Sequence, residues 1–171
     1  MTSSKKGDFS AIEQINAGHA TTGFDCGSEE LNRYLQKHAL QNTRVDGAVS
    51  RVTTKNGIVA GYYSLAAGAL EHTGATARVR KGLARHPIPL VILARLAVDK
   101  TAQGHGLGEA LLKDALVRTA KAADLIGVRA LIAHAKDENA KAFYERFDFE
   151  ESPTDPLHMF LLMKDIRLAL G

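Results

Sequence analysis

Cysteine is nearly absent from this chain, tryptophan is missing, and no apolar run is long. Cys26 is the only cysteine among 171 residues, which excludes an internal disulfide and indicates a reducing compartment. We expect Cys26 to be a small buried hydrophobe rather than a nucleophile. No window approaches the roughly 20 apolar residues of a membrane span, and no apolar segment follows the two lysines of MTSSKKGDFS. We therefore expect a cytoplasmic protein without a signal peptide.

Acidic residues are also missing from one interval, between Glu71 and Asp99. That interval carries five cationic residues, namely Arg78, Arg80, Lys81, Arg85 and Arg95. The net charge of +3 is modest, but a local field of one sign favours a polyanionic partner, either nucleic acid or a phosphate-rich cofactor. A solvated loop accounts for the same charges equally well when composition alone is considered.

What is present is the composition of an ordinary globular domain, with 45% hydrophobic and 24% charged residues. At this length we expect one domain, residues 1–171, with a core of its own. In the first half, Ser28 to Asn42 predicts a helix with Ser28 as its N-cap. Asn56-Gly57 predicts a hairpin between strands Ala48 to Thr54 and Ile58 to Ala67. Residues 72–87 are expected to form a loop with a short helical piece.

The second half alternates strands and helices. The apolar run from Pro89 to Asp99 predicts a central strand covered on both faces. A helix from about Gly108 to Ile126 follows, with its apolar face formed by Leu111, Leu112, Ala115, Leu116, Ala123 and Ile126. Further elements are a strand at Val128 to Ala135, a helix at Asp137 to Phe147 and a last strand in HMFLLMKDI, residues 158–166. The sum is an α/β (α+β) domain with mixed strand order.

A glycine-rich turn, QGHGLG, joins the central strand to the helix after it. Successive backbone N–H groups in such a turn, together with the helix dipole, bind phosphate. A P-loop is excluded because it requires Gly-Lys-Ser/Thr at its end, and the dinucleotide fingerprint is excluded because the glycines fall at 104, 106 and 108. A tight turn whose glycines serve packing only is the other interpretation.

The turn resembles the Arg/Gln-x-x-Gly-x-Gly/Ala signature of the GNAT acetyltransferase superfamily. It follows LARLAVD, which is similar to the strand that opens in this superfamily to receive the pantetheine arm, and it precedes NAKAFYERFDF, which resembles the closing motif. The resemblance implies a GNAT fold, in which helices flank a central, mixed, mostly antiparallel twisted sheet with a splayed parallel strand pair. It also implies acetyl-coenzyme A as the cosubstrate.

The same resemblance implies roles for individual residues. Tyr144 takes the place of the general acid that protonates the leaving thiolate. A backbone N–H near Leu96 or Ala97 would polarise the acetyl carbonyl, and Ala97 and Val98 would pair with the pantetheine arm. The residues expected to wrap the pyrophosphate are Gln103, Gly104, His105, Gly106, Leu107 and Gly108. Asn139 either bonds the coenzyme or is only a polar residue of the first helical turn.

The chemistry of acetyl transfer to an amine supports the role given to Tyr144. An α-amino group has a pKa of about 7.7 to 8.0, so a substantial fraction is neutral near pH 7 to 8 without a general base. The leaving thiolate benefits more from general acid catalysis, and a tyrosine hydroxyl can donate a proton to it. The alternative is that Tyr144 belongs to an amphipathic helix face and serves only in the core.

Five segments extend the resemblance to the TacT-like toxins, small GNAT proteins of bacterial toxin-antitoxin pairs. They are FDCGSEELNRYL, GYYSLAAGAL, PIPLVILARLAVD, ADLIGVRALIAHA and FYERFDF. This resemblance implies acetylation of the α-amino group of aminoacyl-tRNA, which stops translation. It further implies a ribbon-helix-helix antitoxin, contact with operator DNA only through that antitoxin, and a homodimer.

Two positions depart from the family pattern. Gln103 stands where many members have arginine, which removes a charged phosphate contact but keeps a hydrogen-bond donor. Asp148 stands where the family has glycine, and aspartate tolerates left-handed backbone angles better than most residues do. We therefore expect the turn at Asp148 to survive.

A tRNA acceptor arm is a dense polyanion, and cations that contact its phosphates supply affinity that salt weakens. Our candidates are Arg78, Arg80, Lys81 and Arg85, with Arg33, Lys37 and Lys136 added although each fits a solvated charge equally well. Arg95 lies in an apolar strand, so we expect it to be paired or to line the site. We predict no metal, because no metal-ligand spacing relates His38, His72, His86, His134 and His158.

Other functional classes fit parts of the sequence. A GNAT enzyme that acts on a small amine or a protein N-terminus would leave the basic segment unexplained. A non-catalytic sensor of acetyl-coenzyme A would leave Tyr144 without a role. A nucleic-acid-binding protein without chemistry would leave the glycine turn without a ligand.

Overall fold

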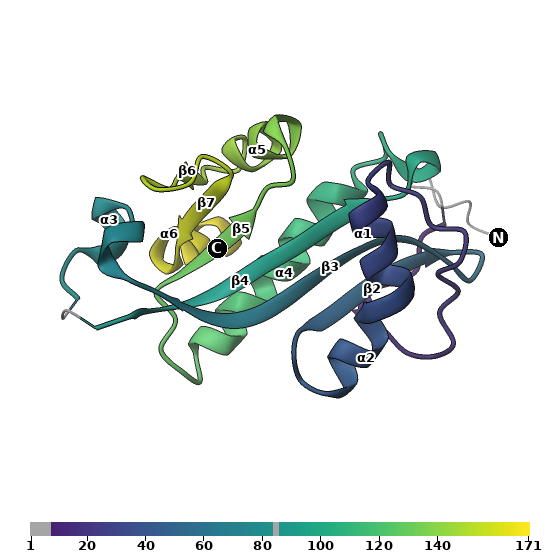
Figure 1. Cartoon of the computed structure of the whole chain (residues 1–171), viewed down its shortest axis with the longest axis horizontal. Helices are drawn as coiled ribbons and strands as arrows, with labels where there is room; N and C mark the ends of the chain where they lie inside the picture. The colour runs from purple at the N-terminus through teal and green to yellow at the C-terminus, as the bar shows by residue number, and fades with distance from the viewer. Residues whose placement is uncertain (1–7, 84–85) are drawn as a thin grey trace. The chain divides into compact units, whose positions relative to one another are not determined.

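The computed structural model describes residues 8–83 and 86–171 as a sheet with flanking helices (Figure 1). Its strands follow the order β1-β2-β3-β4-β5-β7-β6. The chain divides into two compact units, and β3, β4 and α4 run through both. The first unit comprises residues 1–65 and 95–115, and the second comprises residues 66–94 and 116–171. The predicted mixed, mostly antiparallel sheet with flanking helices is confirmed.

The first unit contains the predicted N-terminal helix. It runs through α1 (Glu29–Arg33), the π-helical η1 (Tyr34–His38) and α2 (Ala39–Arg44). Ser28 is its N-cap, as predicted, because the Ser28 hydroxyl accepts a hydrogen bond from the N–H of Leu31 at 3.3 Å. Core residues of this unit come from both the helix and the sheet, among them Cys26, Leu31, Tyr34, Leu35, Val52 and Tyr62. The prediction that Cys26 is buried is thus confirmed.

The predicted hairpin is confirmed with small shifts at its ends. Strands β2 (Val49–Lys55) and β3 (Ile58–Leu70) pair antiparallel. Asn56 and Gly57 have φ values of 54° and 80°, as a two-residue type I′ turn requires. The short strand β1 (Glu13–Gln14) adds to the free edge of β2. Two residues are too few to give a readable alternation, so the sequence did not predict it.

The second unit contains the one parallel pair among the described strands. Strand β4 (Ile88–Val98) pairs with β5 (Ala130–His134) from Leu90 to Leu93. Pairing with β5 ends there, although β4 continues to Val98. Strand β7 (His158–Leu162) lies antiparallel to β5 and also pairs with β6 (Glu150–Glu151). The end of β4 is therefore left without β5 as a partner.

Most elements of the second half agree with the prediction, but three ends do not. The helix predicted to end at Phe147 ends at Glu145. The predicted helix to Ile126 is wrong at its end, since α4 (Leu107–Ala123) stops earlier and Ile126 is 63% exposed. The last predicted strand is wrong beyond Leu162, because α6 (Met163–Leu170) begins there. Met163 and Ile166 are buried three residues apart while the residues between them face outward or are partly covered, which is helical rather than strand spacing.

Short helices complete the fold. The basic segment holds η2 (His72–Gly74) and α3 (Ala77–Arg80), as the expected helical piece in a loop. Helix η3 (Lys100–Ala102) precedes the glycine turn. Helix α5 (Glu138–Glu145) begins after Asp137, whose carboxylate accepts a hydrogen bond from the N–H of Ala140 at 2.8 Å. That N-cap confirms the predicted acidic start of this helix.

Candidate functional site

The glycine turn lies between η3 and the N-terminus of α4. Gly104 and Gly106 have φ values of 84° and 76°, which L-residues with a side chain rarely adopt. A Cβ atom at either position would meet nothing within 4 Å. Glycine is therefore required by the backbone conformation, and the space beside the turn is open. Gly108 differs, because it is the second residue of α4 and does not have a positive φ.

An open turn at the start of a long helix can bind an anion. The residues of the turn from Gln103 to Gly106 are exposed, and α4 continues for 17 residues. The dipole and the unpaired N–H groups of a helix N-terminus favour negative charge. His105 is exposed, as expected, and its ring centroid lies 6.2 Å from that of Phe9. Backbone groups rather than a side chain thus offer the anion contacts.

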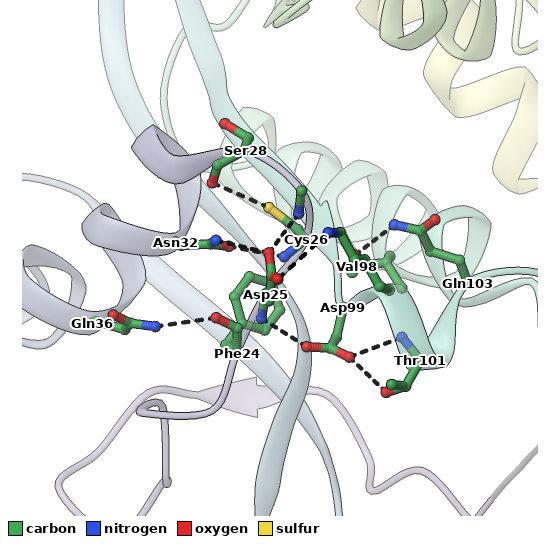
Figure 2. A network of polar contacts seen from close by, with 12 residues as sticks. Phe24, Asp25, Cys26, Ser28, Asn32, Gln36, Val98, Asp99, Thr101 and Gln103 are labelled. Carbon is green, nitrogen blue, oxygen red and sulfur yellow. Dashed lines mark hydrogen bonds and ion pairs between the residues drawn. The ribbon is translucent and has the colours of Figure 1, made fainter.

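Gln103 has a partner that the sequence did not predict. Its side-chain amide donates a hydrogen bond to the carbonyl of Val98 at 3.0 Å (Figure 2). This bond ties the glycine turn to the last residue of β4. Gln103 was expected to donate to phosphate. One of its two amide N–H groups donates to Val98 instead, and the other is left for a phosphate.

Two aspartates hold the end of β4 against the segment before α1 (Figure 2). Asp99 accepts hydrogen bonds from the N–H of Asp25 at 2.7 Å and from the N–H and hydroxyl of Thr101 at 2.9 and 2.6 Å. Asp25 accepts from the N–H of Gly27 at 2.9 Å and from the Asn32 amide at 3.0 Å. Sequence reasoning missed this network. The bonds within each turn could have been predicted, because both aspartates form Asx turns with the residue two positions on.

These hydrogen bonds shift the acidity of both aspartates. For Asp25, the bond from the Gly27 N–H and the bond from Asn32 lower the pKa below its ordinary value. For Asp99, partial burial raises the pKa, but the bonds from Thr101 and from the Asp25 N–H outweigh it, so the pKa is lowered overall. Both groups are therefore carboxylates at neutral pH, and each accepts from several N–H donors.

Strand β4 presents one cation inside its apolar pattern. Arg95 is half-buried, whereas Leu93 and Ala97 on the same strand face are 0% and 5% exposed. The guanidinium carbon of Arg95 lies 3.5 Å from the centroid of the Tyr34 ring. Arg95 was expected to be paired or to line the site. The structure shows that its partner is an aromatic ring of η1.

Tyr144 lies on α5, in the second unit. Its side chain is 3% exposed and contacts the rings of Phe143 and Phe149. Within the described ranges, 8–83 and 86–171, its hydroxyl makes no hydrogen bond. Burial raises the pKa of the phenol, so the hydroxyl keeps its proton across the physiological range. The ring is buried, and the hydroxyl carries a proton that it does not share with any described residue.

Two other residues of this segment were singled out from the sequence, Asn139 and Asp148. Asn139 is exposed in the first turn of α5. Asp148 has a φ of 69°, and the N–H of Phe149 bonds the carbonyl of Tyr144 at 3.3 Å. The predicted left-handed turn is therefore kept with aspartate in the place of glycine.

The basic segment is held by an arginine that the sequence analysis did not single out. Arg129 donates through Nε to the carbonyl of Val79 at 2.8 Å, and through Nη2 to the carbonyls of Arg78 and Lys81 at 3.2 and 3.0 Å. One guanidinium thus caps the last carbonyls of α3. Arg129 precedes β5 by one residue, and no local pattern could have linked it to residues about 50 positions earlier.

The predicted cations differ in what they contact. Arg78 pairs with Asp165 at 2.9 Å, and Arg80 bonds the carbonyl of Ala75 at 3.5 Å and lines a cavity of about 620 Å³ together with Glu71. Among the predicted cations that the structure describes, Lys81, Arg33, Lys37 and Lys136 are exposed and form no ion pair. Arg85 lies outside the described residues.

Two further searches concern sites of other kinds. Among the residues that the structure describes, no group of three or more histidine, cysteine, aspartate or glutamate side chains could hold a metal ion. No helix in the described ranges is long and apolar enough to cross a membrane.

Residues 49–151 match the acetyltransferase (GNAT) domain family. A tRNA-acetylating toxin of Mycobacterium tuberculosis is 47% identical to this chain over 163 residues. The match covers 95% of this chain and 98% of that toxin. The similarity thus extends well beyond the domain shared by the whole family.

Solved structures of the protein AtaT are similar over nearly their full length. AtaT complexed with acetyl-methionyl-tRNAfMet has a TM-score of 0.87 and 28% identity, covering 96% of this chain and 100% of that one. A tyrosine-to-phenylalanine mutant of AtaT, bound to acetyl-CoA and the C-terminus of the antitoxin AtaR, gives 0.83 and 28%, covering 96% and 99%. The AtaT–AtaR complex bound to DNA gives 0.76 and 29%, covering 94% and 99%.

Proposed function

Because this chain belongs to the GNAT family of acetyltransferases, we propose that it transfers acetyl from acetyl-coenzyme A to the α-amino group of aminoacyl-tRNA and thereby blocks translation. The observation that carries this proposal is the 47% identity, over 95% of the chain, to a tRNA-acetylating toxin. The glycine turn and the buried Tyr144 supply the two features that such chemistry needs.

The turn offers a fitting site for the pyrophosphate of the coenzyme. Gly104 and Gly106 leave open space beside backbone N–H groups at the start of α4, and Gln103, His105, Leu107 and Gly108 complete the segment. The pantetheine arm would pair with the backbone of Ala97 and Val98. The Val98 carbonyl already accepts from Gln103, so a pantetheine amide would share this oxygen, which has two lone pairs. Asn139 is a further candidate for a polar contact with the coenzyme.

In the reaction, the neutral α-amino nitrogen attacks the acetyl carbon of the thioester. A backbone N–H at Leu96 or Ala97 would stabilise the negative charge on the carbonyl oxygen. The N–C bond forms, the C–S bond breaks, and the sulfur takes a proton from the Tyr144 hydroxyl. The nitrogen releases its extra proton to water, and Tyr144 regains one from the same source. Burial raises the pKa of Tyr144, so the hydroxyl is protonated at neutral pH, as a general acid must be before the thiolate leaves.

The predicted cations would contact the phosphates of the tRNA. In the second unit, Arg80, Lys81 and Lys136 are exposed, and Arg78 is partly neutralised by its ion pair with Asp165. Arg85, which lies outside the described residues, remains a candidate from the sequence. In the first unit, the predicted cations are Arg33 and Lys37. Contacts of this kind give affinity that falls as salt rises.

The same comparisons support a set of partners. We assign the chain a cognate antitoxin with a ribbon-helix-helix part and a tail that binds the toxin, since AtaT is found with the C-terminus of AtaR. Operator DNA would be contacted through the antitoxin, in keeping with the DNA complex of AtaT–AtaR. We further propose a homodimer that acts in the cytoplasm, where aminoacyl-tRNA is found.

The test is acetyl transfer with purified protein and labelled acetyl-coenzyme A. Charged tRNA, deacylated tRNA, a small amine and a peptide N-terminus are offered in parallel, and the Tyr144→Phe variant is run beside the wild type. We expect label only in charged tRNA, with most of it lost in the variant. Label in the amine or the peptide alone would replace this proposal by the other GNAT activity, acetylation of a small amine or a protein N-terminus.

A further inference from the structure

Arg95 is a cation at a position where the surrounding strand is apolar. It lies in β4, in the apolar sequence IPLVILARLAV, and is half-buried. Among the described residues no carboxylate pairs with it, and its guanidinium contacts the ring of Tyr34 instead. A partly desolvated cation without an anion is unfavourable, and a stack on an aromatic ring offsets this only in part. A methionine or leucine would fill the same space.

The ring beneath Arg95 is held rigidly. The Tyr34 hydroxyl accepts a hydrogen bond from the Asn42 amide at 2.9 Å, and the Tyr34 ring stacks on that of Tyr62 with centroids 6.4 Å apart. Tyr62 in turn donates to the carbonyl of Leu31 at 2.7 Å. The N–H donors of a guanidinium lie in its own plane, so a stack on a ring face leaves them available to an anion.

Tyr34 also begins the π-helical segment η1. Single π-helical turns within an α-helix are frequent at functional sites. Tyr34 at the start of this segment contacts Arg95 of β4, so a helix residue and a strand residue together form the candidate site.

The position of Arg95 in β4 indicates which anion it meets. Arg95 directly precedes Leu96 and Ala97, one of which is proposed to bind the acetyl carbonyl oxygen through its N–H, and a strand advances about 3.3 Å per residue. The anion must therefore lie close to the reacting amine. The pyrophosphate of the coenzyme is not this anion, because it is assigned to the glycine turn. In aminoacyl-tRNA, the amino acid is esterified to the terminal ribose, and the 5′-oxygen of that ribose carries the last phosphodiester.

We propose that Arg95, held on Tyr34, binds the phosphate of the 3′-terminal nucleotide of aminoacyl-tRNA and so places the α-amino group at the acetyl carbonyl. This inference rests on the proposed function and names a determinant of acceptor binding within it. Arg95 favours acceptors whose terminal nucleotide carries this phosphate over acceptors that lack it, independently of the basic segment in the second unit.

The test compares acceptors that differ by one phosphate. Aminoacyl-adenosine, its 5′-monophosphate and full aminoacyl-tRNA are acetylated by the wild type, Arg95→Met and Arg95→Lys. Arg44→Met is the matched control, since Arg44 is an exposed cation at the end of α2 in the same unit. Melting temperature and the KM for acetyl-coenzyme A are measured for every variant.

We expect Arg95→Met to raise the KM for the 5′-monophosphate and for tRNA by roughly 10- to 100-fold, the range of a charge-assisted hydrogen bond. Arg95→Lys should lie between wild type and Arg95→Met, because lysine keeps the charge but loses the fork. The KM for aminoacyl-adenosine and for acetyl-coenzyme A should stay within about twofold, and Arg44→Met should resemble the wild type.

Three results would overturn the inference. They are an unchanged KM for the 5′-monophosphate, an equal rise for aminoacyl-adenosine, and a rise confined to acetyl-coenzyme A. Each concerns the variants relative to an active wild type. Failure of the proposed function looks different, because the wild type itself would then leave charged tRNA unlabelled.

Discussion

Replacing Arg129 by methionine should loosen the basic segment and weaken tRNA binding without changing the coenzyme site. Helix α3 has four residues, too few to be stable by its own hydrogen bonds. Its last carbonyls depend on the three bonds from Arg129, of which the Nε bond is partly buried and the two Nη2 bonds are exposed.

The expected magnitude follows from these three bonds. A net hydrogen bond is worth about 1 kcal/mol, and one to a charged group about 1.5 to 3 when shielded from water. Counting the partly buried bond at about 1.5 kcal/mol and each exposed bond at about 0.5, the loss is roughly 2.5 kcal/mol. For a chain of this size that corresponds to a fall in melting temperature of roughly 5 to 10 °C.

Thermal unfolding and hydrogen exchange provide the assay. In Arg129→Met, amides of α3 should exchange faster than those of α5, and the KM for charged tRNA should rise while the KM for acetyl-coenzyme A does not. Arg167→Met is the control, because its partner Asp124 is 4.0 Å away and both side chains are largely exposed. A melting temperature for Arg129→Met within 1 °C of this control would refute the reasoning.

Three further outcomes are expected. Tyr144→Phe should lower kcat by roughly 10²- to 10⁴-fold yet keep its melting temperature, since the hydroxyl has no partner among the described residues; a large loss of stability in thermal unfolding would contradict this. Because the pKa values of Asp25 and Asp99 are lowered by folding, their stabilising contribution is complete above about pH 5 and is lost as the pH falls below about 4; Asp99→Asn should flatten the acid limb of unfolding free energy against pH. Gly104→Ala should cost about 1 to 2 kcal/mol and weaken coenzyme binding measured by calorimetry, whereas Gly127→Ala, which has space and no positive φ, should be close to neutral.

The elements with strong local signals could be predicted from sequence. Asn56-Gly57 fixed the hairpin because a type I′ turn needs two left-handed residues, and both have positive φ. Ser28 and Asp137 marked helix starts, since each side chain accepts from an N–H three residues on. The glycines at 104 and 106 were readable for the same reason, as their conformation is required by the local backbone.

The errors came where packing overrides a local pattern. Met163 and Ile166 are apolar whether residues 163–166 form a strand or a helix, and only their burial beside exposed Lys164 decides for the helix. Ile126 continues the apolar period of α4, but the helix ends at Ala123. Residues 124–126 contain no glycine or proline, so the sequence gives no signal that the helix ends before them. The prediction therefore made the helix three residues too long.

The residues that could be predicted from the sequence and those that could not differ in the substrate that they are proposed to bind. In the proposed function, backbone N–H groups would bind the phosphates of the coenzyme, and the sequence requirement for such a turn is the spacing of its glycines, which is local in the chain. The acceptor RNA would be bound by side chains, and the direction of a side chain depends on residues that are distant in the sequence. Arg129 donates to the carbonyl of Val79, 50 positions earlier, and Arg95 stacks on Tyr34 of another element. Substitutions that alter acceptor choice should therefore be found among such supporting residues as well as among the cations themselves.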